Sequence, residues 1–281
     1  TTGSNNIVVG TGALGQNTTA SNNTAVGYQA GYANTTGYNI VAVGRAALAG
    51  NTTGNDNTAV GQASLAANTT GINNTGVGSA SLYSTTTGSA NSALGLSALY
   101  TNTTGNYNIG IGQQALYSNT TASYNTAVGY QAGYTMTTNS GNTMVGYQAG
   151  YLATGGGDLF GYRAGYNNTG SGIAAFGTQA LTANTSGSAN TAMGVQALFS
   201  NTTASNNTAV GYQAGYSNTT GSAITALGYQ AGYTSNGTPF TAVGYQALKA
   251  NTTGRNTSVG VNSSLANTTG TANTVVGDKI G

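Results

Sequence analysis

The chain has 281 residues, of which 46 are glycine and only 3% are charged, against about 25% in ordinary soluble domains. A net charge of +2 spread along this length predicts no basic surface for nucleic acid or an anionic membrane. The absence of cysteine excludes disulfides and thiolate metal sites, and no apolar run approaches the roughly 20 residues of a transmembrane helix.

A glycine recurs about every seventeen residues along the whole chain, and a bulky apolar residue precedes it each time. Twelve of the sixteen intervals are 17 residues, three are 16 and one is 15. A strict short period indicates small units that bury one another's apolar surface. We expect one repeat array over residues 1–281, irregular at 146–177. The glycines are Gly10, Gly27, Gly44, Gly61, Gly78, Gly95, Gly112, Gly129, Gly146, Gly161, Gly177, Gly194, Gly211, Gly228, Gly244, Gly260 and Gly277.

Each repeat resembles one coil of a β-solenoid. Thr24–Val26 is short and alternating, which favours a strand, whereas the density of glycine, threonine and asparagine disfavours a helix. Asn34-Thr35-Thr36-Gly37 has turn chemistry, and a second short strand fits between Gly27 and this turn. We predict an all-β, parallel β-solenoid (β-roll) of about 17 coils with two short strands per coil, forming a rod about 80 Å long at about 4.8 Å per coil.

The interior of this coil is expected to be one side chain deep. Alternation places Thr24 and Val26 on one face of the strand and Ala25 on the other. Three residues after the glycine only alanine or serine occurs in the first sixteen repeats, which indicates a tight site. We predict that the valine faces this small residue across the core. The predicted core residues are Val26, Val60, Val128, Val145, Val210, Val243, Ala30, Ala132 and Ala214.

An asparagine four residues before the glycine recurs in most repeats. Stacked coils would place these amides about 4.8 Å apart, close enough to hydrogen-bond along the stack. The predicted asparagine ladder comprises Asn23, Asn57, Asn74, Asn91, Asn108, Asn125 and Asn142. Where asparagine fails, the replacement is mostly apolar, as at Ile40, Ile173, Ile224 and Phe240, which we interpret as a sign of lateral contact between chains.

Tyrosines follow a second pattern. Where tyrosine follows the repeat glycine, the fourth and fifth residues after that glycine are usually glycine and tyrosine; otherwise the fourth is usually leucine. We interpret these as two ways of covering one patch, with leucine or with a tyrosine ring over a glycine. Stacked tyrosines could shield the core or offer rings to sugars. The candidate glycan contacts are Tyr130, Tyr134, Tyr147, Tyr151, Tyr162 and Tyr166.

Catalysis and metal binding find no support in the residues. The chain has no histidine, cysteine or glutamate, and its three aspartates fall in separate repeats. The nearest two would lie about 29 Å apart at about 4.8 Å per coil, whereas paired-carboxylate hydrolysis needs about 5–9.5 Å. Calcium-binding β-rolls need an aspartate in nearly every turn. We predict no enzymatic activity, no cofactor and no metal site.

The turn threonines and asparagines leave two further possibilities open. Asn-Thr-Thr-Gly satisfies the N-glycosylation pattern, although turn chemistry alone also favours it. Arrays of threonine on a charge-poor solenoid are typical of ice-binding surfaces. The threonine pairs are expected in turns rather than on a flat strand face, which argues against ice binding.

The segments Asn23–Ala30, Asn125–Ala132 and Asn207–Ala214, each followed within the repeat by a turn, resemble the head repeats of trimeric autotransporter adhesins. They are even more similar to repeats of phage and bacterial trimeric fibre proteins. The resemblance covers the whole chain and implies a left-handed, trimeric, extracellular and non-enzymatic β-roll. The seventeen-residue repeat is longer than the usual adhesin coil.

These observations predict an extracellular structural fibre or filament shaft on a cell surface or virion, with an adhesive role in a phage tail fibre or microbial surface appendage. We expect no nucleic-acid partner and no membrane insertion. Both chain ends fall inside a repeat, so we expect the ends of the stack to be covered either by further domains of a longer protein or by other copies of the chain. We predict an oligomer or filament, with a trimer as the leading form. A cell-surface glycan is the other expected partner. The alternative is a glycan- or ice-binding β-solenoid module.

Overall fold

The computed structural model describes residues 2–236, 239–252 and 254–279, and the described residues contain strands and turns but no helix. The chain divides into two compact units, Thr1–Asn142 and Thr143–Gly281. The strands of the first unit are β1 (Ile7–Val9), β2 (Thr24–Val26), β3 (Val41–Val43), β4 (Thr58–Val60), β5 (Thr75–Val77), β6 (Ser92–Leu94), β7 (Ile109–Ile111) and β8 (Thr126–Val128). Those of the second are β9 (Thr143–Val145), β10 (Gly157–Phe160), β11 (Ile173–Phe176), β12 (Thr191–Met193), β13 (Thr208–Val210), β14 (Thr225–Leu227), β15 (Thr241–Val243), β16 (Thr257–Val259) and β17 (Thr274–Val276).

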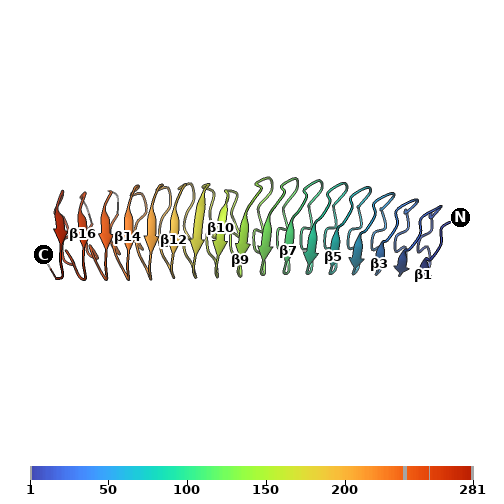
Figure 1. Ribbon diagram of the computed structural model, residues 1–281, viewed down its shortest axis with the longest axis horizontal. Coiled ribbons are helices and arrows are strands. Elements are labelled where there is room, and N and C mark those ends of the chain that lie inside the picture. The colour runs from blue at the N-terminus through green and yellow to red at the C-terminus, as the bar shows by residue number, and fades with distance from the viewer. Residues whose placement is uncertain (1, 237–238, 253, 280–281) are drawn as a thin grey trace. The chain divides into compact units, whose positions relative to one another are not determined.

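Within each unit the strands pair in chain order and in parallel, so each repeat forms one turn of a β-solenoid (Figure 1). The pairing register places equivalent residues of consecutive repeats opposite each other: in the β2–β3 pair, Ala25 lies opposite Ala42. The irregular stretch keeps this arrangement, because β10 pairs with β9 and with β11. The predicted all-β parallel solenoid is confirmed.

Each described coil contains one strand, and the segment in which we predicted a second strand has a different backbone. After Gly27, Gln29 has φ 54° and Gly31 has φ 59°, so alternate residues are left-handed rather than extended. Their amides still join the coils: Gln29 N–H donates to the Thr11 carbonyl (3.0 Å) and Gly31 N–H to the Ala47 carbonyl (2.8 Å). Because left-handed residues alternate along this segment, its backbone amides donate hydrogen bonds to the preceding coil and to the following coil.

The repeat glycine is required by close backbone approach. Gly27 has φ 135°, and a Cβ built there would lie 2.6 Å from the carbonyl oxygen of Gly44 in the next coil. Since Gly44 stands in the same relation to Gly61, any side chain at this position would separate the coils. The strict glycine period therefore follows from stacking, and the bulky residue before it is free to vary.

The predicted strand orientation is wrong. Ala25 at the centre of β2 is completely buried, while Val26 is only half-buried and Val60 and Val210 are 36% and 37% exposed. A Cβ built on Gly76, the equivalent of Ala25 in β5, would lie 2.6 Å from Ser64 Oγ. The interior is too narrow for valine here, so the small residue faces inward. Consequently none of the predicted core valines points into the core: Val26, Val60, Val128, Val145, Val210 and Val243 are half-buried or exposed.

The small residues three positions after the glycine do face the interior, as predicted: Ala30, Ala132 and Ala214 are completely buried. The rest of the core comes mainly from the leucine one position further on. Leu48, for example, is fully buried despite a left-handed φ of 49°, a conformation that costs an ordinary residue about 1–2 kcal/mol. Two interactions offset that strain: burial of the Leu48 side chain, and the hydrogen bond that the Leu48 backbone N–H donates to the Ser64 carbonyl (3.0 Å).

Glycine replaces this leucine where another apolar side chain fills the core. A Cβ on Gly31 would lie 3.5 Å from Ile40 Cδ1, and one on Gly215 would lie 3.3 Å from Ile224 Cδ1. Phe240 occupies the same place beside Gly232. Ile40, Ile173, Ile224 and Phe240 are all buried, so they complete the core of their own coils. Our interpretation of them as lateral contacts between chains is therefore wrong, and it is isoleucine or phenylalanine, rather than a tyrosine ring, that compensates for these glycines.

Candidate interaction surfaces

The asparagines predicted to form a ladder are buried, and they join the coils. Asn57, Asn74, Asn91, Asn108 and Asn125 form an unbroken series in which each Oδ1 accepts the backbone N–H of the next asparagine at 2.9–3.0 Å, ending at Asn142. Each Nδ2 in this run also donates to a turn carbonyl, as from Asn57 to Gly71 (2.7 Å). Asn23 makes the equivalent bonds to Ile40 N–H (2.9 Å) and the Gly37 carbonyl (3.0 Å). These side chains are buried and hydrogen-bond within the stack of coils, so they are not exposed to bind a ligand or partner.

A second asparagine ladder, which the sequence reasoning missed, runs through the turns. Asn51 Nδ2 donates to Asn34 Oδ1 (2.9 Å) and to the Gly54 carbonyl (2.9 Å), and Asn68 Nδ2 donates to Asn51 Oδ1 (2.7 Å). All three side chains are fully buried. The recurrence of asparagine seven residues after the repeat glycine in most repeats was the available signal. A glycan on Asn51 Nδ2 would break this ladder and has no space, so the folded chain is incompatible with modification there.

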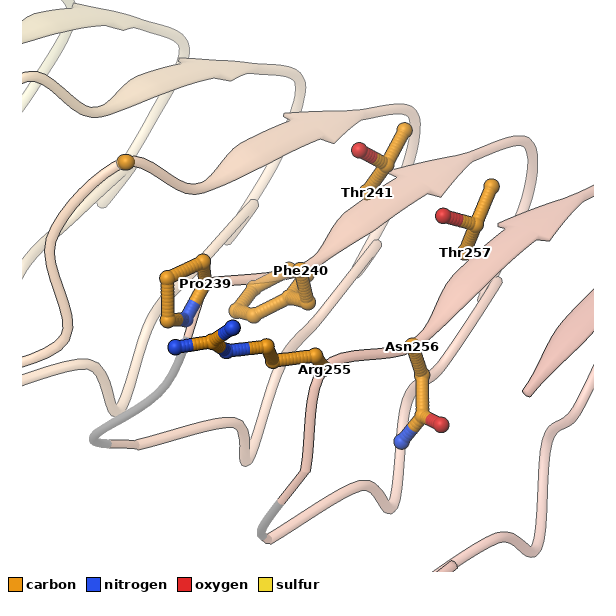
Figure 2. A pocket seen from close by; sticks show the side chains of 7 residues that line it. Pro239, Phe240, Thr241, Arg255, Asn256 and Thr257 are labelled. Atoms are coloured by element: carbon orange, nitrogen blue, oxygen red, sulfur yellow. The ribbon is translucent and has the colours of Figure 1, made fainter. Parts of the chain in front are cut away.

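The turn threonines divide into two roles. The first of each pair bonds to the next coil, as when Thr52 Oγ1 donates to the Thr69 carbonyl (2.9 Å), whereas the second, such as Thr53, is exposed. The threonines at the start of most strands form a third set. Thr58 on β4 and Thr75 on β5 pair in register, and Figure 2 shows Thr241 and Thr257 projecting in the same direction from successive strands. The threonine pairs lie in turns, as expected, whereas the strand threonines form a separate column that points outward rather than into the core.

This outward strand face carries one column of mostly threonine and one of mostly valine. We define it as the outward face: within each unit, the first and third residues of each three-residue strand, and the second and fourth residues of β10 and β11. The exposed apolar members include Leu94, Ile109 and Ile111 on β6 and β7 and Met193 and Val210 on β12 and β13. Among the described strands, Asp158 on β10 is its one charged residue. The face is thus a regular, nearly charge-free surface of methyl and hydroxyl groups.

The six candidate glycan tyrosines belong to two columns of aromatic rings, one and five residues after the repeat glycine. Tyr147 stacks on Tyr162 (5.4 Å between centroids) and Tyr151 on Tyr166 (5.2 Å). Tyr134 stacks on Tyr117 (5.1 Å), and Tyr130 lies 38% exposed in the first column. Stacking covers ring faces, which are the surfaces that sugars use. The columns therefore present mainly ring edges and hydroxyls.

Arg163 and Asp56 both contact uncharged side chains. Arg163 extends over the rings of Tyr162 and Tyr166, at 5.4 and 5.2 Å from their centroids, and its Nε donates to Gln148 Oε1 (3.0 Å). Asp56 accepts from Asn39 Nδ2 (3.0 Å). Residues 2–236, 239–252 and 254–279 contain no cluster of three acidic, histidine or cysteine side chains that would hold a metal ion.

A shallow depression of about 210 Å³ lies in the second unit, where Phe240 replaces the ladder asparagine (Figure 2). Its lining combines Pro239, Phe240 and Arg255 with the threonines of β15 and β16. Figure 2 shows the Arg255 side chain passing Phe240 towards Pro239. Arg255 is the one charged residue among those that line the depression.

Comparison of the chain with protein-family models, with curated proteins and with solved structures finds no match to any of the three. In the part of the chain that the structure describes, no helix has the length and apolar character to cross a membrane.

Proposed function

We propose that the protein is an extracellular structural shaft of a fibre or filament, with an adhesive role on a cell surface or virion such as that of a phage tail fibre. The observation that carries this proposal is the continuous bonding between coils within each unit. Strand pairs, two asparagine ladders and turn hydroxyls all connect equivalent residues of consecutive repeats. Polar side chains that would serve a pocket elsewhere are used here to hold a stack together.

The arrangement suits a mechanical role because stability comes from short-range contacts repeated many times. Few charges contribute to it, so salt and pH should have little influence on the stack. Small-angle scattering of the full chain tests the proposal: the seventeen repeats predict an elongated particle of about 80 Å at about 4.8 Å per coil. A compact particle would contradict a shaft.

We further propose that the outward face binds a second copy of the chain, with a trimer as the leading assembly. Exposed apolar side chains follow one another there in consecutive coils, as with Leu94 on β6 and Ile111 on β7, joined by Leu96 just after β6. Contiguous exposed apolar surface marks interaction sites. A charge-poor face that repeats from coil to coil is complementary to another copy of itself, whereas an acidic or basic partner would find no counter-charge.

A second candidate function, ice binding, is favoured by the column of strand threonines on the same face. Regularly spaced hydroxyl and methyl groups on a rigid, nearly uncharged sheet could order water. Thermal hysteresis measured on wild type, on Thr58→Lys in the outward face and on Thr53→Lys in the exposed turn distinguishes the two roles. Hysteresis lost only in Thr58→Lys supports ice binding, and its absence from monomeric wild type eliminates it.

Glycan adhesion through the tyrosine columns remains part of the proposed adhesive role, restricted to ring edges and hydroxyls. A glycan-array screen of wild type beside Tyr147→Phe and Tyr162→Phe tests it, since these changes keep the ring stack and remove only the hydroxyls. Equal binding by all three proteins, or none by wild type, would reject a hydroxyl-mediated site.

A further inference from the structure

Four tyrosines in consecutive coils of the first unit form one column, which we call the tyrosine column: Tyr83, Tyr100, Tyr117 and Tyr134. Adjacent rings lie 5.1 Å apart between centroids, and the angles between their planes are 5°, 5° and 14°. Tyr83 is 38% exposed and the other three are half-buried. The coil-to-coil bonding fixes each ring against its neighbour while leaving part of each ring open to solvent.

The composition makes these phenols the most readily oxidised groups of the region. The whole chain contains no cysteine and no tryptophan, but 19 tyrosines. Two of its three methionines, Met136 and Met144, are buried. A one-electron oxidant that reaches the column therefore meets tyrosine first, and no thiol competes for the radical that forms.

We propose that the tyrosine column is a site of oxidative cross-linking, in which a one-electron oxidant of the peroxidase class joins neighbouring coils by dityrosine bonds. Each of two adjacent phenols loses one electron and its hydroxyl proton. The two radicals couple through the ring carbons next to the hydroxyl groups, forming one C–C bond. The hydrogens on those carbons then move to the oxygens and restore both aromatic rings. One molecule of hydrogen peroxide accepts the two electrons and two protons and becomes two molecules of water.

Proximity selects the pairs that react. Rings held about one coil spacing apart are at a far higher effective concentration than rings on separate molecules. Each bond would connect residues seventeen positions apart in the sequence, so a column of such bonds would resist separation of the coils. A shaft exposed to oxidants would then become more stable by reaction rather than be damaged.

The test treats the dilute, folded full-length chain with a haem peroxidase and hydrogen peroxide, followed by elastase digestion and tandem mass spectrometry. We expect intramolecular links joining Tyr83 to Tyr100, Tyr100 to Tyr117 and Tyr117 to Tyr134, each with a loss of two hydrogens. Their yield should not change on tenfold dilution. Links dispersed over unrelated tyrosines, or found only between molecules, would overturn the proposal.

Tyr100→Phe provides the matched variant. Phenylalanine is tolerated in this kind of column, since Phe199 stacks on Tyr216 at 5.2 Å in the second unit. The variant should lose both links made by residue 100 and keep the one between Tyr117 and Tyr134. Tyr38 serves as an internal control, because Ser21 and Asn55 precede and follow it at the same repeat position; it should form no intramolecular link. Survival of the same link pattern in guanidinium chloride would show that the fold does not select the pairs and would likewise reject the proposal.

Discussion

Ile224 occupies the space that Gly215 leaves in the core of the second unit: a Cβ built on Gly215 would lie 3.3 Å from Ile224 Cδ1. In the preceding coil Leu198 is the equivalent of Gly215, and Asn207 is the equivalent of Ile224. A larger side chain at one position therefore accompanies a smaller one at the other: leucine and asparagine stand in one coil, and glycine and isoleucine in the next.

This exchange predicts a strong coupling between the two residues. Gly215→Leu alone overpacks the core and Ile224→Asn alone leaves a cavity, each destabilising by about 1–3 kcal/mol. The double variant restores the leucine and asparagine of the preceding coil. Its loss of unfolding free energy should be smaller by about 1–3 kcal/mol than the sum of the losses of the two single variants. Urea unfolding of the four proteins measures this cycle; strictly additive effects would show that the side chains do not share one space.

The repeat glycine should tolerate no side chain. A Cβ on Gly112 would lie 2.5 Å from the Gly129 carbonyl oxygen, whereas nothing lies within 4 Å of a Cβ on Gly141. Both glycines have positive φ, 124° and 74°. Gly112→Ala should cost at least about 3 kcal/mol and Gly141→Ala about 1–2 kcal/mol. Thermal denaturation compares them, and equal losses would contradict the close approach of the coils.

The inward orientation of the central strand residue predicts opposite outcomes at adjacent positions of β8. Ala127 is completely buried and Val128 is half-buried. Ala127→Asp places a carboxylate in the core, which raises its folded-state pKa above the unfolded value of about 3.9. The variant is therefore most stable below that unfolded pKa and loses stability as pH rises through the folded pKa.

Val128→Asp should retain protease resistance close to that of wild type at neutral pH. Proteolysis of both variants at pH 4 and pH 8 separates the two orientations. Sensitivity of Val128→Asp together with resistance of Ala127→Asp at pH 8 would reverse the assignment of the strand faces.

A gap in the turn ladder predicts a stabilising change. Among the described residues, buried Asn68 Oδ1 has no hydrogen-bond partner, because Thr85 stands where the next coil would supply an asparagine. Thr85→Asn provides the missing Nδ2 donor and should raise the free energy of unfolding by about 1–2 kcal/mol. Thr87→Asn, at an exposed position of the same turn, should change it by less than about 0.5 kcal/mol. Chemical denaturation that finds no gain for Thr85→Asn would contradict a continuous ladder.

The period and the residue types predict much of this fold. Glycine every seventeen residues identified the coils, and the constancy of Asn57 and its equivalents identified a buried ladder. Alternation along Thr24–Val26 separated the two faces of the strand but could not say which was inside, because a two-residue period is symmetric. Side-chain size decides that question: alanine or glycine occupies the centre of most strands, and the larger Met144 and Leu159 are buried there beside glycines, Gly150 and Gly165.

Other features arise only when the coils are stacked. Residues such as Gln29 and Leu48 carry no propensity for positive φ, so the non-strand half of the coil could not be foreseen from them. Ile40, Ile224 and Phe240 were interpreted as contacts between chains because the glycine beside which each one packs lies nine or eight residues earlier in the sequence, and only the folded coil brings the two together. The outward position of the strand threonines likewise depended on the strand orientation.

Self-association through the outward face changes the mass of the particle in solution, and sedimentation equilibrium measures that mass. Three proteins are compared over a range of concentrations: wild type, Ile111→Lys in the exposed apolar part of the face, and Thr104→Lys in an exposed turn. The account predicts that wild type and Thr104→Lys associate to the same oligomer, with a trimer as the leading form, and that Ile111→Lys is shifted towards monomer while remaining folded by circular dichroism. Wild type that stays monomeric, or an Ile111→Lys variant that associates as strongly as wild type, would contradict it.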